Sequence, residues 1–497
     1  MSKDEIAHLN ESSEMDDPVH QFILGATYYN GIVGEPDYKE AVKWFRLSAE
    51  QGYVMGQFFL GLCYLDGTGV EKSKPKGVEW MRKAAEQGDA QAQFNLALSY
   101  EKGEGVKKDM KEAAKWYRMA AEQDDAHAQY GLGHCYYWGE GLRACKKKAV
   151  EWWQKSAEQG LYQAQYFLAM CYYHGDGVKM DKKEAVKWYR KAAEQGDADA
   201  QFELAQCYDN GKGVSEDRKE AVEWYRKAAE KKHANAQYCL AVCYYCGDGV
   251  ARNLKKAFEW CQKSAEQGLS QAQYFLAMCY YHGDGVKMDK TEAVKWYRKA
   301  AEQGKVDAQF ELAQCYNEGV GVRENKKAAA EWYSKAAEQG HRDAQFYLGV
   351  CYSEGLGVKK DKKKAFEWWQ KAAEQGLSDA QFNLGACYKS GKGVKKDYAQ
   401  AVKWYRLVAE QGDPTAQYIL GNCYFYGEGV EEDEAEVLKW LRKAAKQGHA
   451  GAQYNLGICY EFGYGVRKSR KTAVEWYRKA AEQGEEKAQE RLEENGK

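Results

Sequence analysis

The sequence predicts an all-α fold, an α-solenoid superhelix of helix–turn–helix repeats with a period of 36 residues. The first observation is a tryptophan that recurs at a fixed step, at Trp44, Trp80, Trp116, Trp152, Trp188, Trp224, Trp260, Trp296, Trp332, Trp368, Trp404, Trp440 and Trp476. Trp44 and Trp476 are 432 residues apart, which is twelve steps of 36. A strict period of this length is typical of stacked copies of one supersecondary unit, because no copy buries its apolar face without a neighbour.

The second observation is that the segment 184–208 carries two apolar stripes with helical spacing. The earlier stripe is formed by Ala185, Trp188, Tyr189, Ala192 and Ala193, and the later one by Ala200, Leu204, Ala205 and Tyr208. Apolar residues at i, i+3, i+4, i+7 and i+8 indicate a helix with one buried face. We therefore expect each repeat to have a first helix of the later type, followed by a second helix of the earlier type.

The predicted helix ends carry recognisable signals. A G-x-G-V turn such as Gly175 to Val178 joins the two helices of a repeat, since glycine adopts positive φ readily. The second helix starts at an aspartate with a glutamate three residues on, as in Asp181 and Glu184, which resembles a capping box. It ends at A-E-Q-G, where the glycine is expected at the C′ position.

Two repeats lack the glycine that ends the second helix. Asp124 and Lys232 stand in its place, and we expect each to adopt the left-handed conformation at a cost of about 1 kcal/mol. The four prolines fit helix starts: Pro18 and Pro414 at first helices, Pro36 and Pro75 at second helices. The outward face of second helices carries glutamate–lysine pairs four residues apart, which we expect to support an exposed helix; examples are Glu151 and Lys155, Glu223 and Lys227, and Glu367 and Lys371.

These signals divide the chain into three parts. We expect a polar N-terminal tail at 1–16, thirteen tandem repeats at 17–484 and a C-terminal capping helix at 485–497. The last segment, EEKAQERLEEN, is polar on most sides, as the end of a stack requires. The segment Ala149 to Val214 nearly repeats as Ala257 to Val322 at an offset of 108 residues, so a cassette of three repeats was duplicated.

Composition excludes several classes of partner. Lys plus Arg is 73 against 74 for Asp plus Glu, so no net field favours nucleic acid or an anionic membrane. No stretch has the length and apolarity of a signal peptide core or a membrane span, which favours a cytoplasmic protein. Export by a route that reads no such signal is left open. We also expect the protein to be monomeric. Eleven of the fifteen cysteines share one repeat position and are expected to be buried free thiols: Cys63, Cys135, Cys171, Cys207, Cys243, Cys279, Cys315, Cys351, Cys387, Cys423 and Cys459.

The string A-Q-x-x-L-G-x-C-Y-x-x-G-x-G-V followed by A-x-x-W-Y-R-K-A-A-E-Q-G resembles the Sel-one-like (SLR) repeat, a relative of the tetratricopeptide repeat with a longer turn. The resemblance covers the chain from Asp17 to its end; the first copy departs from it, with Gly31 and Gly34 as its turn glycines. It implies a right-handed solenoid that holds other proteins together. It also implies an enzyme alternative, because some cysteine-rich secreted relatives carry a β-lactamase label.

The chemical alternatives each have a weak signal. A β-lactamase needs S-x-x-K, S-D-N and K-T-G elements, and of these only Ser73 to Lys76 matches. A zinc site is conceivable at four cysteines, Cys239, Cys243, Cys246 and Cys261, or at His174 and His282, each three residues after a cysteine. Neither set has the ligand number and turn geometry of known zinc sites, so we predict no cofactor, no metal and no catalysis. We interpret the basic runs Lys146 to Lys148 and Lys359 to Lys364 as solvated linkers.

The positions that vary between repeats predict the binding surface, because packing fixes the others. In first helices they hold His134, Tyr137 and Trp138; Met170, Tyr173 and His174; Tyr245; Met278, Tyr281 and His282; and Asn422, Phe425 and Tyr426. In tetratricopeptide relatives the corresponding positions line the concave groove, and aromatic side chains there suit a peptide. The alternative is that some, Tyr137 and Tyr173 especially, pack on the adjacent first helix.

We therefore predict a non-catalytic scaffold or adaptor that binds an unidentified protein or peptide in its concave groove. A secreted effector or host-interaction module of the same fold is the alternative, and a β-lactamase-like hydrolase is a third.

Overall fold

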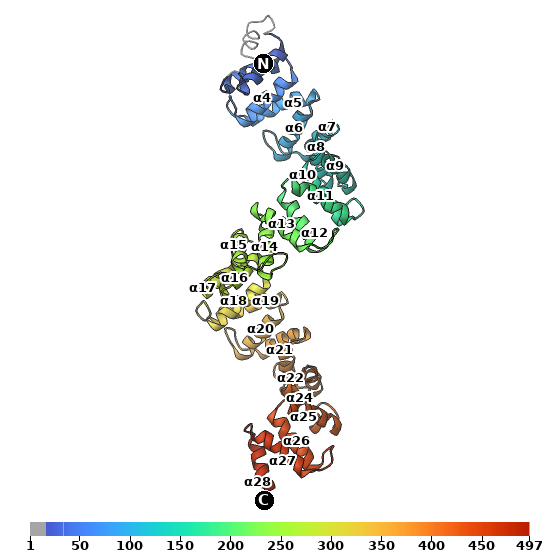
Figure 1. The fold of residues 1–497 in the computed structure, drawn as a ribbon, viewed down its shortest axis with the longest axis vertical. Helices are drawn as coiled ribbons and strands as arrows, with labels where there is room; N and C mark the ends of the chain where they lie inside the picture. The colour runs from blue at the N-terminus through green and yellow to red at the C-terminus, as the bar shows by residue number, and fades with distance from the viewer. Residues whose placement is uncertain (1–15, 33, 497) are drawn as a thin grey trace. The chain divides into compact units, whose positions relative to one another are not determined.

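The computed structural model describes residues 16–32 and 34–496, so the predicted tail 1–16 lies outside the described residues except for Asp16. All regular structure in the described residues is α-helical. The chain divides into two compact units, 1–253 and 254–497, and in each the helices follow one another in chain order (Figure 1). In this part of the chain no helix combines the length and the apolar character that crossing a bilayer requires.

The first unit consists of alternating first and second helices. Its first helices are α2 (Pro18–Tyr29), α4 (Val54–Asp66), α6 (Ala90–Lys102), α8 (Ala126–Trp138), α10 (Tyr162–His174), α12 (Ala198–Asp209) and α14 (Ala234–Cys246). Its second helices are α3 (Tyr38–Glu50), α5 (Lys74–Glu86), α7 (Met110–Ala121), α9 (Lys146–Glu158), α11 (Lys182–Glu194) and α13 (Arg218–Glu230).

The second unit continues the same alternation. Its second helices are α15 (Leu254–Glu266), α17 (Lys290–Glu302), α19 (Lys326–Glu338), α21 (Lys362–Glu374), α23 (Tyr398–Glu410), α25 (Glu434–Lys446) and α27 (Arg470–Ala481). Its first helices are α16 (Ser270–His282), α18 (Val306–Glu318), α20 (Arg342–Glu354), α22 (Ser378–Ser390), α24 (Pro414–Tyr426), α26 (Ala450–Phe462) and the terminal α28 (Glu486–Gly496).

The core of each unit lies between helices that are neighbours in the chain. Both apolar stripes predicted from the segment 184–208 are buried along their length, from Ala185 to Tyr208. Small alanines let α11 and α12 approach closely, while Trp188, Tyr189 and Leu204 fill the space between them. The prediction of two amphipathic helices per repeat is therefore confirmed.

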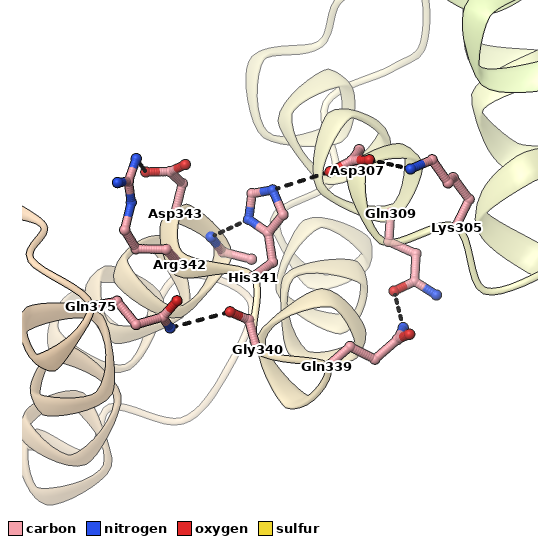
Figure 2. Close-up of polar contacts among 10 residues, drawn as sticks. Lys305, Asp307, Gln309, Gln339, Gly340, His341, Arg342, Asp343 and Gln375 are labelled. Atoms are coloured by element: carbon pink, nitrogen blue, oxygen red, sulfur yellow. Dashed lines mark hydrogen bonds and ion pairs between the residues drawn. The ribbon is translucent and has the colours of Figure 1, made fainter. Parts of the chain in front are cut away.

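A buried glutamine links three successive helices in the repeats. Gln309 of α18 donates through Nε2 to the carbonyl oxygen of Ala301 in α17, at 3.1 Å. Its Oε1 accepts from Nε2 of Gln339 at the end of α19, at 2.8 Å (Figure 2). Gln375 extends the series, because its Nε2 donates to the carbonyl oxygen of Gly340 at 3.2 Å. The amide of Gln309 is 4% exposed, so these bonds satisfy polar groups that water does not reach.

The two glycines of the G-x-G-V turn have different roles. Gly139 ends α8 in the left-handed conformation, with φ of 75°. Gly141 also has positive φ, and a Cβ atom there would overlap with the carbonyl oxygen of Met110, the first residue of α7. The second glycine is therefore needed for contact between repeats as well as for backbone geometry.

At the start of α11 the predicted aspartate cap forms, but the predicted capping box does not. Asp181 caps α11, since its carboxylate accepts from the backbone N–H groups of Lys183 and Glu184 at 3.0 Å. Glu184 does not return the bond of a capping box; its carboxylate pairs with Lys187 at 2.7 Å. A cation three residues along the same helix competes for the glutamate more effectively than a backbone N–H.

The three glutamate–lysine pairs named in the prediction do not form, although the equivalent pair of Glu79 and Lys83 in α5 does, at 3.6 Å. Lys155, Lys227 and Lys371 extend over the rings of Trp152, Trp224 and Trp368 instead, with Nζ 4.4, 3.6 and 3.9 Å from the ring centroids. A half-buried indole face gives the ammonium a favourable quadrupole and covers its aliphatic stem, whereas an exposed glutamate offers little.

The predicted left-handed residues are confirmed, since φ is 64° at Asp124 and 65° at Lys232. The second junction has a further defect. Lys231 stands where other repeats have the terminal glutamine, and its ammonium bonds to the carbonyl oxygen of Gly196. The Oε1 atom of buried Gln201 is consequently left without a hydrogen-bond partner.

We expect the double variant Lys231→Gln, Lys232→Gly to raise the local unfolding free energy of α12 and α13. The glycine removes about 1 kcal/mol of backbone strain, and the restored bond to Gln201 adds about 1 kcal/mol. Hydrogen exchange of the amides in the two helices measures the change. Asp124→Gly serves as the comparison and should gain less, because Asp124 accepts from Nε2 of Gln129 at 3.3 Å. Unchanged exchange in the double variant would contradict the assignment.

Three first helices begin at a histidine. His233, His341 and His449, spaced by 108 residues, each accept through Nδ1 from the backbone N–H three residues on, at 3.1 to 3.2 Å. Each ring stacks on the aromatic ring 31 residues earlier at 4.6 Å, and His341 also has Asp307 beside its Nε2 (Figure 2). Burial lowers the pKa of all three imidazoles.

These caps should make stability fall in mild acid. Because the folded-state pKa lies below the usual value near 6.5, their contribution is complete above that pH and is lost as the pH falls through the folded-state values. We expect the drop in thermal unfolding temperature between pH 7.5 and 5.5 to shrink when all three are replaced by asparagine, which caps without titrating. An equal drop in both proteins would show that other groups cause it.

Candidate functional site

The predicted binding residues lie in the last two turns of first helices, in three rows. His134, Met170, Met278 and Asn422 are half-buried, and so are Tyr137, Tyr173, Tyr245, Tyr281 and Phe425. Trp138, His174, His282 and Tyr426 are exposed. Trp138 and Tyr426 show 57% and 66% of their surface, so the third row presents aromatic side chains to solvent.

The second row belongs partly to the frame of the repeat. The ring of Tyr137 packs on Trp153 of α9 with centroids 5.2 Å apart, and its hydroxyl donates to Asp176 at 2.6 Å. Lys146, the first residue of α9, bonds to the same carboxylate at 2.6 Å. The bonds from Lys146 and Tyr137 together lower the pKa of Asp176.

Tyr173 and Tyr281 repeat this arrangement with fewer bonds. Their rings pack on Tyr189 and Tyr297 of the following second helices, at 6.4 and 6.3 Å. The alternative prediction for Tyr137 and Tyr173 is contact with an adjacent first helix. Outside their own helices, the aromatic rings next to them belong to second helices. These tyrosines are thus support for the surface as well as part of it.

One pocket of the second unit brings three predicted residues together. It has a volume of about 350 Å³ and opens between α24, α26 and the start of α28. We call it the C-terminal pocket; its lining includes Tyr418, Asn422, Phe425, Tyr426, Tyr454, Asn455, Ile458, Glu485 and Lys487. The side-chain amides of Asn455 and Asn422 are bonded, with Nδ2 of Asn455 donating to Oδ1 of Asn422 at 2.8 Å.

A smaller pocket of the first unit contains one predicted residue. His134 lines a space of about 240 Å³ between α6, α8 and α10, with Phe94, Glu101 and Tyr130. The other predicted residues line neither of these two pockets.

The repeat pattern matches a known family along nearly its whole length. The model of the Sel1 repeat matches thirteen consecutive segments: 21–53, 54–89, 90–125, 126–161, 163–197, 198–233, 234–269, 270–305, 306–341, 342–377, 378–413, 414–449 and 450–485. The chain belongs to the Sel1 repeat family. Members of this family are generally protein-interaction scaffolds.

Solved structures agree with this assignment. A protective antigen of uropathogenic Escherichia coli with an SLR fold is 37% identical, covers 91% of this chain and 97% of its own, and has a TM-score of 0.75. A Sel1 repeat protein of Oxalobacter formigenes is 33% identical over 66% of this chain and 92% of its own, with a TM-score of 0.50. A comparison with curated proteins gave no match.

The positions that we predicted from variation between repeats leave out one residue that lines the C-terminal pocket. Asn455 lies three residues before Ile458, the residue equivalent to Asn422. The equivalents of Asn455 are as varied as the predicted positions, for example Gly131, Phe167 and Glu203. Variation at this fourth position was therefore the signal that could have identified Asn455.

The cysteines at the Sel1 repeat position lie in the core, as predicted. Burial raises the pKa of Cys135 and Cys171 to about 12, so these thiols stay protonated. Among the proposed zinc ligands, Cys243 is buried and Cys246 is exposed, while Cys261 donates to the carbonyl oxygen of Ala272 at 3.2 Å. The described residues contain no group of three or more His, Cys, Asp or Glu side chains suited to a metal ion.

The single S-x-x-K match lies at a helix start. Ser73 precedes α5 and makes no side-chain cap bond. The ammonium of Lys76 lies over the ring of Tyr64, 5.8 Å from its centroid. The lysine is thus engaged with the neighbouring first helix.

Replacing Tyr137 and Trp138 separately should distinguish frame from surface. We expect Tyr137→Ala to lower the free energy of unfolding by about 2 kcal/mol, because a half-buried ring and a bonded hydroxyl are lost. Trp138→Ala should change it by less than about 0.5 kcal/mol. Urea titration followed by circular dichroism measures both. Comparable losses in the two variants would mean that Trp138 also supports the repeat.

Proposed function

We propose that this Sel1 repeat protein is a non-catalytic scaffold that binds an extended peptide segment of another protein on the exposed face of its first helices. The observation that carries the proposal is the C-terminal pocket, where two asparagine amides and several aromatic rings converge. The family assignment supports the same class of function.

The chemistry of the C-terminal pocket suits a peptide backbone. Each asparagine amide has donors and an acceptor, and the mutual bond between Asn455 and Asn422 uses only one of each. The remaining groups can bond to the N–H and C=O of a chain laid across them. Phe425 and exposed Tyr426 supply contact area for an apolar side chain of that chain.

Charged residues at one end of the C-terminal pocket favour one orientation of the proposed peptide. Glu485 and Lys487 lie at the start of α28, on the same lining as the rings. A bound peptide can carry a charged residue on one side of its apolar anchor. That residue would be attracted by one of these two groups and repelled by the other, so one orientation of the peptide is preferred.

Selection from a random peptide-display library on the full chain tests the proposal. We expect the selected peptides to lose about tenfold or more in affinity for Tyr426→Ala and for Asn455→Ala, measured by fluorescence anisotropy. Leu407→Ala is the matched control, because Leu407 is an exposed apolar residue of α23 in the same unit and outside the pocket. Peptides that bind wild type and both pocket variants equally would contradict the proposed site.

A host-facing role is the second candidate. It is favoured by the likeness to the uropathogenic Escherichia coli protein, which is described as a protective antigen. We expect the endogenous protein to be found in the culture medium or on the cell surface if this role is correct. Cell fractionation with a cytoplasmic marker checks this, and recovery only with the marker would rule the role out.

A further inference from the structure

Cations at the first position of second helices follow a regular pattern of partners. Lys74, Lys146 and Arg218 each pair with an acid 30 residues on, in the turn of the next repeat: Glu104 at 3.1 Å, Asp176 at 2.6 Å and Asp248 at 3.0 Å. Lys182 and Lys290 extend over the tyrosine ring nine residues before them, at 5.4 and 3.2 Å from the centroids of Tyr173 and Tyr281. Lys326 pairs with Glu324 at 3.2 Å. A partner is therefore the rule at this position.

Lys362, the first residue of α21, has neither an acid 30 residues after it nor a tyrosine nine residues before it. The residue nine positions before it is Ser353 in place of tyrosine, and the residue 30 positions after it is Lys392 in place of an acid. Within the described residues neither lysine forms an ion pair or lies over an aromatic ring. Two like charges thus occupy positions where three other repeats place an attractive pair.

These two lysines line a pocket of about 360 Å³ between α20, α21 and α22. We call it the lysine pocket; its polar lining is Ser353, Glu354, Lys360, Lys362, Asn383, Ser390 and Lys392. Glu354 is its one acid, and it accepts a bond from Ser353 at 3.0 Å. Three lysines against one glutamate leave a net charge of +2, since 3 − 1 = 2.

The charge of Lys392 also acts on the floor of the lysine pocket. Burial raises the pKa of Cys387 to about 11, and the ammonium of Lys392 works in the opposite direction. The three ammonium groups themselves are on exposed residues, so an anion reaches them from solvent.

A counterpart pocket in the first unit has the equivalent lysine paired with an acid. A space of about 380 Å³ is lined by Asp66, Lys72, Lys74, Asn95 and Glu104, which stand eight repeats before Glu354, Lys360, Lys362, Asn383 and Lys392. There Glu104 pairs with Lys74 at 3.1 Å. The counterpart also has Lys102 on its lining, where the lysine pocket has Ser390, so three lysines there face two acids and leave a net charge of +1. The main difference lies in the turn, where Glu104 pairs with a lysine and Lys392 does not.

We propose that the lysine pocket binds a phosphomonoester dianion. A phosphate monoester carries a charge of about −1.5 to −2 at neutral pH, which matches the net charge of the pocket. Its oxygens accept from Lys360, Lys362 and Lys392, and the amide of Asn383 supplies an uncharged donor. A single carboxylate would neutralise only half of the charge. The proposal does not depend on peptide binding in the C-terminal pocket.

Isothermal titration of the full chain tests the proposal with defined probes. They are a capped five-residue alanine peptide with one central phosphoserine, the same peptide with serine or glutamate at the centre, and inorganic phosphate. We expect the phosphoserine peptide to bind and both other peptides to bind at least tenfold more weakly. Tighter binding of the phosphopeptide than of inorganic phosphate assigns the dianion to a phosphorylated side chain, and equal binding assigns it to free phosphate.

Lys392→Glu is the decisive variant, because it recreates the ion pair of Lys74 and Glu104 in the lysine pocket. We expect it to weaken phosphopeptide binding more than tenfold without lowering the thermal unfolding temperature. Lys392→Gln, which removes one charge, should give a smaller loss, and Lys72→Glu in the counterpart pocket should give none. Failure of the wild-type chain to bind at millimolar concentration, or equal binding by wild type and Lys392→Glu, would overturn the proposal.

Discussion

A buried glutamine of the first helix joins neighbouring repeats, because it bonds both to the preceding repeat and to the end of its own repeat. Gln309 faces a carbonyl oxygen of the preceding second helix on one side and the terminal glutamine of its own repeat on the other. A buried amide that lacked these partners would be costly, so the bonds fix one register of stacking among the many that alanine-rich surfaces allow. At Gln201, where Lys231 replaces the partner, the cost is visible as an unpaired oxygen.

The same register explains the second glycine of each turn. Gly141 touches the backbone of α7 in the preceding repeat, so a side chain there would separate the two repeats. The turn glycines and the buried glutamines hold each first helix in position. The side chains in its last two turns are therefore not needed for that purpose. These side chains are consequently the ones that vary without loss of the fold.

That freedom gives chemically different pockets on one frame. In the C-terminal pocket the variable positions hold asparagine and aromatic residues. In the lysine pocket they hold serine, alanine and one glutamate, and three lysines line the same space. The difference arises from single substitutions: Ser353 stands where Tyr173 and Tyr281 accept a lysine, and Lys392 stands where Glu104 accepts one. The proposed phosphate chemistry of the lysine pocket depends on these two exchanges.

The sequence by itself determined the period, the two helices of each repeat, their buried faces and their ends, because these depend on residues within one or two turns of each other. Asp124 and Lys232 were predictable as left-handed residues for the same reason. Variation between repeats also singled out Asn422, Phe425 and Tyr426, which line one pocket. Only the tertiary structure decided which partner each side chain takes. Asn455 joins Asn422 from the next repeat, and Lys392 lines the same pocket as Lys362, thirty residues earlier in the chain. Such choices depend on how neighbouring repeats are packed, and the spacing within one helix carries no record of them.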